Sequence, residues 1–325
     1  MKRKLFYLLA AMLLLLSACT GTVSEQNTAS SSQKEQQEQN TAYYQFEDSL
    51  GNMVTLQEQP KRVAALMGSY AETWILSGGE LVAVTQDAYD ERGLELSEDI
   101  VNVGTNQQPD MEALFAAEPD FVILTADMEG QVNMKESLAS AGIPAAWFKV
   151  ESFEDYLWML DICTDLTGRK DLYEQNGISI QATIDETIAA VPEGEQPTVL
   201  LLRAYSTGVR AKNSDNIAGQ VIADLGAINI ADSDAGLLED LQMESILAAD
   251  PDYILVTTMG SSQEAALASL EELFNSDPAW QSLTAMKEDR VEILPKNLFH
   301  YKPNAKWGES YTMLFEILYG EHETA

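Results

Sequence analysis

Short, unbroken runs of apolar residues recur along the body of the chain, separated by stretches with helical spacing. RVAALM at 62–67, LVAVT at 81–85, FVILT at 121–125 and TVLLLRAY at 198–205 are such runs. Continuous apolar runs of this length are typical of strands that are covered on both faces of a sheet. Their alternation with helices predicts an α/β fold with mostly parallel sheets. Ahead of them, YYQFEDSLGNMVTLQ at 43–57 alternates around a turn and predicts an edge hairpin.

One phrase occurs twice in the sequence, as DMEALFAAEPDFVIL at 110–124 and as QMESILAADPDYILV at 242–256. Each copy predicts a short helix, a stop at a proline (Pro119 or Pro251) and a buried strand. The elements around the two copies also correspond, so the sequence predicts two α/β lobes built on one unit. A purely structural duplication would also explain the repeat, because helix, Pro-Asp and strand suit many α/β units.

Both copies keep a glutamate at the same place, Glu112 and Glu244, in the first helical turn. In a parallel α/β layer, helices begin at the edge where strands end, which is the edge where ligands bind. A carboxylate in the first turn contributes only about 0.3 to 1 kcal/mol through the helix dipole, and Asp or Ser would serve as well. The retained Glu therefore favours a role in docking a partner.

The segment between the lobes predicts two helices. The first ends at Thr167 and Gly168, and the second extends without a proline over 169–191 and joins the lobes. In the first lobe, Ser69 is expected to cap a helix that ends at Gly78 and Gly79. The expected domains are a signal peptide (1–18), a disordered tether (19–42), an N-terminal α/β lobe (43–168), the connecting helix (169–191) and a C-terminal α/β lobe (192–325).

The N-terminus has the layout of a secretory signal peptide, with early positive charges, an apolar run from Leu5 to Leu16 and small residues after it. The run is shorter than the ~20 residues of a membrane-spanning helix, so a permanent anchor is the weaker interpretation. LSAC at 16–19 resembles the lipobox of bacterial lipoproteins, which implies lipidation at Cys19; plain cleavage beside an incidental cysteine is the alternative. The segment after Cys19 is Ser, Gln, Glu and Asn with little apolar content and predicts a disordered tether.

The composition limits the classes of function. The net charge is -33, from 19 basic and 52 acidic residues, and no basic cluster marks a nucleic-acid surface. Besides Cys19 the chain has only Cys163, at an apolar helix position, so neither a disulfide nor a cysteine-rich metal site is expected in the body. No G-x-S-x-G, H-E-x-x-H, P-loop or G-x-G-x-x-G motif occurs, and His322 lies in the C-terminal tail, which leaves His300 as the candidate histidine base. No enzyme is predicted, although a surface α/β hydrolase stays an alternative.

The body from 43 to 320 resembles the substrate-binding lipoproteins of ABC importers for iron-siderophores, haem and cobalamin. The stretches that carry the resemblance are KRVAALMGSYAETWILSGGELVAVT, VGTNQQPDMEALFAAEPDFVIL, LASAGIPAAWF and ADLGAINIAD. The resemblance implies a class III binding protein, with two lobes joined by one long helix and a ligand cleft between them.

The same resemblance implies a monomer held by its lipid on the extracytoplasmic face of the cell membrane. Its partners would be an ABC permease and its ATPase, and Glu112 and Glu244 would form salt bridges with permease arginines. No intrinsic cofactor is expected, and the ligand would be an iron chelate, haem or a corrinoid. A sensor that keeps the fold without transport is an alternative.

The ligand is expected to contact loops at the strand ends: residues 67–70 and 106–108 in the first lobe, and 203–210 and 297–307 in the second. The predicted ligand-binding residues are Met67, Tyr70, Asn106, Arg203, Tyr205, Arg210, His300, Tyr301, Lys302, Lys306 and Trp307. Aromatic rings can cover a macrocycle, basic groups can pair with carboxylates or a catecholate, and histidine can ligate a metal.

Each of these assignments has a plainer alternative. Trp307 could pack the start of the last helix, and His300 could be a hydrogen-bonded structural histidine. Met67 and His300 would make an axial pair for haem, one from each lobe, but a methionine at a strand end is usually core. Arg203 and Arg210 could face solvent, although basic groups on cleft loops of so acidic a protein favour an anionic ligand.

Overall fold

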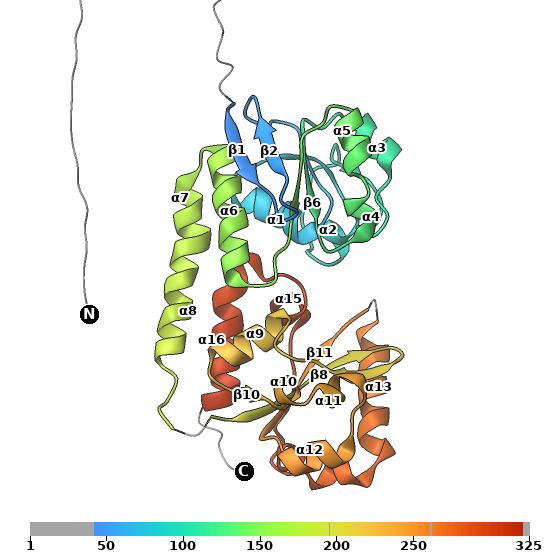
Figure 1. The fold of residues 1–325 in the computed structure, drawn as a ribbon, viewed down its shortest axis with the longest axis vertical. Helices are drawn as coiled ribbons and strands as arrows, with labels where there is room; N and C mark the ends of the chain where they lie inside the picture. Colours follow the sequence, from blue (N-terminus) through green and yellow to red (C-terminus); the bar gives the residue numbers. More distant parts are fainter. Residues whose placement is uncertain (1–41, 195, 261, 321–325) are drawn as a thin grey trace, which may run out of the picture. The chain divides into compact units, whose positions relative to one another are not determined.

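The computed structural model describes residues 42–194, 196–260 and 262–320 (Figure 1). The predicted hairpin is present, with β1 (Tyr44–Glu47) antiparallel to β2 (Met53–Leu56). The first sheet is wholly parallel, with the strand order β5-β4-β3-β6-β7. Its strands are β3 (Val63–Ala65), β4 (Leu81–Val84), β5 (Val101–Asn102), β6 (Phe121–Thr125) and β7 (Ala145–Phe148). Its helices are α1 (Gly68–Leu76), α2 (Asp87–Asp90), α3 (Met111–Ala116), α4 (Glu129–Val132) and α5 (Lys135–Ser140).

The second sheet has the parallel order β10-β8-β11-β12, and β9 is added antiparallel to β8. Its strands are β8 (Thr198–Tyr205), β9 (Gly208–Ala211), β10 (Ile228–Asn229), β11 (Tyr253–Thr258) and β12 (Val291–Ile293). Its helices are α9 (Ile217–Asp224), α10 (Ile230–Ser233), α11 (Ala235–Glu239), α12 (Met243–Ala249), α13 (Gln263–Ser276), α14 (Thr284–Lys287), α15 (Lys296–Phe299) and α16 (Trp307–Tyr319), with 3-10 turns at Pro278–Ser282 and Asn304–Lys306. The expected α/β fold with two mostly parallel sheets is confirmed.

The doubled phrase forms the same structure in both sheets, as α3 followed by β6 and as α12 followed by β11. β4-β3-β6-β7 and β10-β8-β11-β12 are the same strand order, with the phrase's strand third in each. The Asp120 carboxylate accepts hydrogen bonds from the Lys61 and Arg62 amides at 2.9 Å each, and the corresponding Asp252 accepts from the Thr198 amide at 2.7 Å. The Pro-Asp pair of each copy thus ties the phrase to the start of the neighbouring strand.

The prediction that Ser69 caps α1 is wrong. α1 begins at Gly68, and Ser69 is buried inside its first turn. The amide of Gly68 donates instead to Asp87 Oδ2 at 2.7 Å, so a side chain from α2 caps the helix. A Cβ at position 68 would lie 2.7 Å from the Ala88 nitrogen, so α1 and α2 can approach this closely only because residue 68 is glycine.

The segment that joins the sheets contains α6 (Phe153–Thr167), α7 (Lys170–Tyr173), a π-helical turn (Glu174–Ile178) and α8 (Ser179–Ala189). α6 ends at Thr167 and Gly168, as predicted, and Gly168 has the left-handed conformation. The expected uninterrupted helix over 169–191 is helical over 170–189 but contains the π turn. Gly177 lies in this turn, where a Cβ would be 2.8 Å from Leu157 Cδ2 of α6, so the two helices can pack this closely because residue 177 is glycine.

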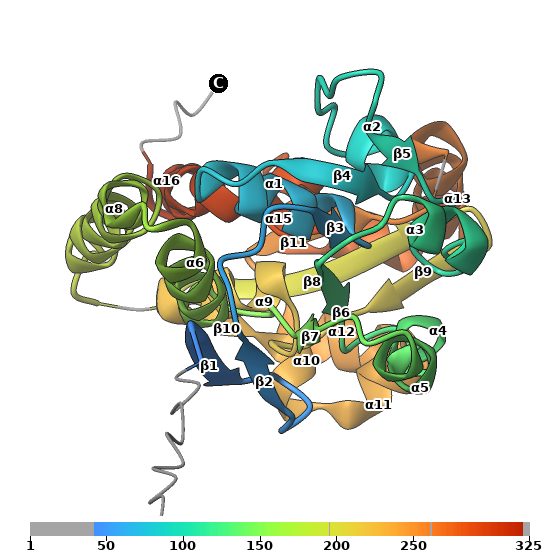
Figure 2. The same cartoon turned by 90° about the horizontal axis from the view of Figure 1, so that it is seen from above.

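One hydrophobic cluster includes residues of both lobes, and two smaller clusters each belong to one sheet. α1 and α6 cover one face of the first sheet, where Trp74 and Tyr156 belong to the shared cluster, and α3 and α5 cover the other. α16 packs beside α8, with Gly308 against Thr183 (Figures 1 and 2). The last helix thus ties the C-terminal lobe to the connecting helix.

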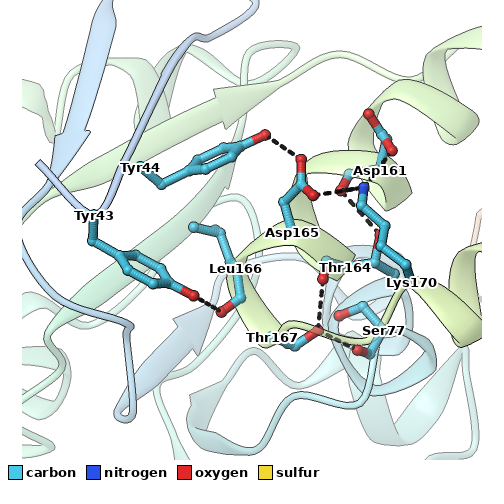
Figure 3. A network of polar contacts seen from close by, with 9 residues as sticks. All are labelled: Tyr43, Tyr44, Ser77, Asp161, Thr164, Asp165, Leu166, Thr167 and Lys170. Atoms are coloured by element: carbon cyan, nitrogen blue, oxygen red, sulfur yellow. Dashed lines mark hydrogen bonds and ion pairs between the residues drawn. The ribbon is translucent and has the colours of Figure 1, made fainter.

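A polar network fixes the start of the described chain to the end of α6 (Figure 3). The Tyr44 hydroxyl donates to Asp165 Oδ2 at 2.7 Å, and the Tyr43 hydroxyl donates to the Leu166 carbonyl at 3.1 Å. Lys170 Nζ lies 2.7 Å from Asp165 Oδ1. Burial and the Asp165 carboxylate raise the pKa of Tyr44. The chain therefore enters the fold at a fixed point beside the connecting helix.

Candidate functional site

Two buried side chains hold the loops at the carboxyl ends of the first sheet. Asp87 Oδ2 accepts from the Gly68 amide at 2.7 Å and from Asn106 Nδ2 at 3.1 Å. Gln131 Nε2 donates to the Leu66 carbonyl at 2.6 Å and to the Asn106 carbonyl at 2.7 Å. Asn106 is thus fixed through both its side chain and its backbone, at the strand end where it was expected.

The segment after β12 lies against the first lobe. Lys302 Nζ is 3.8 Å from Asp127 Oδ2 and 6.0 Å from the centre of the Tyr70 ring. Only 12% of the Lys302 side chain is exposed, and this burial lowers the pKa of its ammonium group. Lys302 was predicted from the second lobe and Tyr70 from the first, and the structure brings them together.

Asn304, two residues further along the chain, makes direct polar contacts with the first lobe. Its Nδ2 donates to the Ser69 carbonyl at 2.8 Å and to Glu72 Oε2 at 2.6 Å. Glu72 also forms an ion pair with Arg92, whose side chain is 6% exposed. Sequence reasoning missed Glu72, Arg92 and Asn304. Asn304 and Glu72 are 232 positions apart, and no spacing in the sequence relates residues at that distance.

His300 lies among positive charges. Burial, followed by the charges of Arg203, Lys296 and Lys302, lowers the pKa of its imidazole to about 4. The imidazole is therefore neutral at pH 7. We define the basic cluster as Arg203, Lys296, His300 and Lys302.

The arginine of the basic cluster is held by neutral oxygens. Arg203 Nε lies 3.3 Å from Thr257 Oγ1, and its Nη2 lies 3.4 Å from Asn216 Oδ1. Lys296 Nζ donates to the Gly260 carbonyl at 2.7 Å. Within the described part of the chain, neither Arg203 nor Lys296 forms an ion pair with a carboxylate.

The expected loop over 203–210 is a β-hairpin instead, because β8 continues to Tyr205 and β9 begins at Gly208. Arg203 lies directly opposite Arg210 across this hairpin. Residues opposite each other in an antiparallel pair point to the same face, and like charges there repel. Tyr205 is half-buried and lines a pocket of about 280 Å³ with Arg210 and Leu237.

Three other predicted ligand residues are largely occupied by protein contacts. Tyr70 is 1% exposed, and its hydroxyl donates to the Phe148 carbonyl at 3.0 Å. Trp307 is fully buried as the first residue of α16 and packs edge-on against Phe153. The alternative that Trp307 packs the start of the last helix therefore describes it better than ligand binding. Met67 packs against the hydrophobic cluster that the lobes share.

The last two predicted residues differ in exposure. Tyr301 is half-buried, with its ring centre 5.3 Å from that of His300, and burial raises the pKa of its hydroxyl. Lys306 is exposed. The structure therefore gathers Lys302, His300, Tyr301 and Arg203 near the junction of the lobes and leaves Lys306 at the surface.

Among the described residues, no group of three or more His, Cys, Asp or Glu side chains is arranged to hold a metal ion. The axial pair of Met67 and His300 stays a prediction. Cys163 is buried in α6, as predicted, and its burial raises the pKa of the thiol.

Glu112 and Glu244 are both exposed in the first turns of α3 and α12. Asp110 caps α3, because its Oδ1 accepts from the Glu112 and Ala113 amides at 2.9 and 3.1 Å. Gln242 makes no such bond at the start of α12. The carboxylates have equivalent places in the repeated unit although only one helix has a side-chain cap.

Some predictions lie outside the described residues. These are the signal peptide, lipidation at Cys19, nearly all of the tether and the tail that contains His322. No helix within residues 42–194, 196–260 and 262–320 is long and apolar enough to cross a membrane.

Comparison with known proteins adds independent findings. Residues 63–298 match the family described as periplasmic binding protein. The Fe(3+)-citrate-binding protein YfmC of Bacillus subtilis is 24% identical over 244 residues, which are 73% of this chain and 74% of the relative. An uncharacterized ABC transporter substrate-binding lipoprotein, YvrC of the same organism, is 23% identical over 75% of this chain and 76% of its own length.

Among solved structures, the siderophore binding protein BauB, bound to ferric iron and two molecules of acinetobactin, has the same fold. It superposes with a TM-score of 0.67 at 18% identity, over 86% of this chain and 99% of that one.

Proposed function

This chain belongs to the periplasmic binding protein family, and on that premise we propose that it is the extracytoplasmic substrate-binding protein of an ABC importer for a ferric chelate. Proteins of this family bind substrates for transport and are not enzymes. An iron chelate is then cargo rather than a resident cofactor. The surface hydrolase and the non-transport sensor find no support among the relatives.

The observation that carries the ligand class is the basic cluster in an otherwise acidic chain. The sequence has 52 acidic and 19 basic residues, yet the positive charges of Arg203, Lys296 and Lys302 all act on His300. Arg203 also faces Arg210 across the hairpin, a repulsion that a bound anion would relieve. Arginine pairs in bidentate fashion with carboxylates. A chelate rich in carboxylates, such as ferric citrate, fits this cluster better than a corrinoid or haem, and one relative is named for ferric citrate.

The test is a titration of the mature protein with ferric citrate, a ferric catecholate, haemin and cyanocobalamin. We expect ferric citrate to raise the melting temperature and quench tryptophan fluorescence. Arg203→Ala should weaken this binding about tenfold or more, since a charged partner of a bound anion is lost. Lys287→Ala, an exposed change on α14, should leave the affinity unchanged.

Absence of any response to all four compounds would refute the proposed function. Tight binding of haemin with an absorbance band for a histidine and methionine pair would instead support the axial role of Met67 and His300. Equal affinity of Arg203→Ala and the wild type for ferric citrate would remove the basic cluster from the site.

We further propose that Glu112 and Glu244 dock the protein on the permease. Their exposure and their equivalent places in the two lobes support this role. The double change Glu112→Ala with Glu244→Ala should abolish iron-55 uptake from ferric citrate in cells that depend on this chain. Its affinity for ferric citrate should not change. Uptake at the wild-type rate would contradict the docking role.

A lipid on Cys19 is proposed as the membrane anchor, supported by the lipobox-like LSAC at 16–19. Two or three acyl chains would hold the protein on a membrane, at about 0.8 kcal/mol per buried methylene. Labelling with radioactive palmitate should be lost in Cys19→Ser, and label retained in that variant would contradict the assignment.

A further inference from the structure

The two copies of the repeated unit each expose a glutamate, a large apolar residue and an alanine at corresponding positions. On α3 they are Glu112, Phe115 and Ala116, and on α12 they are Glu244, Leu247 and Ala248, all of them exposed. A spacing of three and four residues places each set on one face of its helix. Phe115 is 37% exposed and Leu247 is 40% exposed, so each helix carries a large apolar side chain beside its carboxylate.

Neither apolar residue belongs to the core clusters of its sheet. The positions that face the cores are the neighbouring Leu114 and Ile246, which have no exposed surface. A single exposed apolar residue is ordinary on a protein surface. A large one kept at the same position of both copies, three residues after the same glutamate, indicates a contact that both helices make.

The charge of the chain gives a reason for the apolar member. With 52 acidic residues, an exposed carboxylate by itself does not distinguish one part of the surface from another. The centre of a protein interface is depleted of charge, and a few large side chains there provide most of the binding energy. An apolar side chain next to the glutamate would set the two helices apart from the rest of the acidic surface.

We propose that Phe115 and Leu247 are the apolar anchors of two matching docking surfaces, Glu112-Phe115-Ala116 and Glu244-Leu247-Ala248. The partner is the permease, which would offer the same feature twice, a basic side chain beside an apolar pocket, because the two docking surfaces are equivalent. The proposal rests on the proposed transport function and adds apolar residues to the docking glutamates.

The test compares Phe115→Ala, Leu247→Ala and the double variant with the wild type in the full-length, lipid-anchored chain. Iron-55 uptake from ferric citrate should fall about tenfold for each single change, since an anchor at the centre of an interface contributes on this order. It should fall further for the double variant. Ile188→Ala is the matched control, because Ile188 on α8 is also 37% exposed but lies outside the repeated unit.

Affinity for ferric citrate and the melting temperature are measured on the same variants and should equal those of the wild type. Uptake at the wild-type rate in the double variant, while Glu112→Ala with Glu244→Ala abolishes it, would overturn the apolar anchors and leave the proposed function intact. A wild-type chain that supports no uptake and binds no ferric citrate would overturn the proposed function itself.

Sedimentation and vesicle binding test two other partners for these surfaces, a second copy of the chain and lipid. If wild-type protein sediments as a dimer and the double variant as a monomer, the surfaces bind a second copy of the chain. If the variants alone lose binding to protein-free lipid vesicles, the surfaces bind lipid. Either result would overturn the permease as the partner.

Discussion

His300 shows how neighbouring charges set the state of one residue. Its imidazole is mostly buried and feels the charges of Arg203, Lys296 and Lys302, so its pKa falls from 6.5 to about 4. A group whose pKa is lower in the folded than in the unfolded chain stabilises the fold above the unfolded pKa. That stability is lost as the pH falls from about 6.5 toward 4.

The change His300→Gln tests this at the residue scale. Between pH 7 and pH 5, the free energy of unfolding of the wild type should fall by about 2 kcal/mol more than that of the variant. Urea denaturation at pH 7, 6 and 5 measures the difference. Parallel curves for the two proteins would mean that His300 is not buried as a neutral group.

At the scale of one element, the two copies of the repeated unit have the same backbone conformation at a position where their side chains differ. The residue before each Pro-Asp pair, Glu118 or Asp250, has a positive φ of 47° or 39°. Residues other than glycine adopt this conformation at a cost of about 1 to 2 kcal/mol. Asp250 offsets the cost, because its carboxylate accepts bonds of 2.8 Å from the amide and hydroxyl of Thr284, which lower its pKa.

Replacement by glycine should therefore have opposite effects in the two copies. Glu118→Gly should raise the free energy of unfolding by about 0.5 to 1 kcal/mol, because strain is relieved at a helix stop. Asp250→Gly should lower it by about 1 kcal/mol, because the bonds to Thr284 are lost. Denaturation of both variants at pH 7 checks the pair, and equal shifts would contradict the role of the Asp250 carboxylate.

At the scale of the whole molecule, the segment that follows β12 connects the lobes. Asn304 donates to the Ser69 carbonyl and to Glu72, and it is 1% exposed. Its φ of 54° is one that asparagine tolerates better than most residues. This contact lies beside Lys302 and Tyr70, so the same short segment supplies both a polar tie between the lobes and candidate ligand contacts.

Asn304→Asp should weaken this tie. The aspartate keeps the shape of asparagine but replaces a donor by an acceptor that faces Glu72 and a carbonyl. The free energy of unfolding should fall by about 2 to 3 kcal/mol, the cost of two unmade bonds. Asn297→Asp, an exposed change nearby, is the control. A loss of the same size in both variants, or in neither, would show that Asn304 does not tie the lobes.

Much of the fold and part of the candidate site could be predicted because their signals are local. Apolar runs predicted the strands, Pro119 and Pro251 predicted the helix stops, and the resemblance to periplasmic binding proteins is confirmed. Glu112 and Glu244 were placed correctly in the first turns of their helices, because the signals for the start and the end of each helix lie within a few residues of the glutamate. Ser69 failed as a cap because Asp87, from another helix, takes the amide.

By itself, the sequence determined the α/β class, the two lobes of one repeated unit and the family. Apolar periodicity and a repeated phrase can be recognised from the order of the residues alone. Only the tertiary structure decided that Arg203 faces Arg210 in a hairpin, that His300 lies among cations, and that Asn304 reaches Glu72. Asn304 and Glu72 are 232 positions apart and belong to different lobes. Their contact depends on how the lobes pack, which no local pattern encodes.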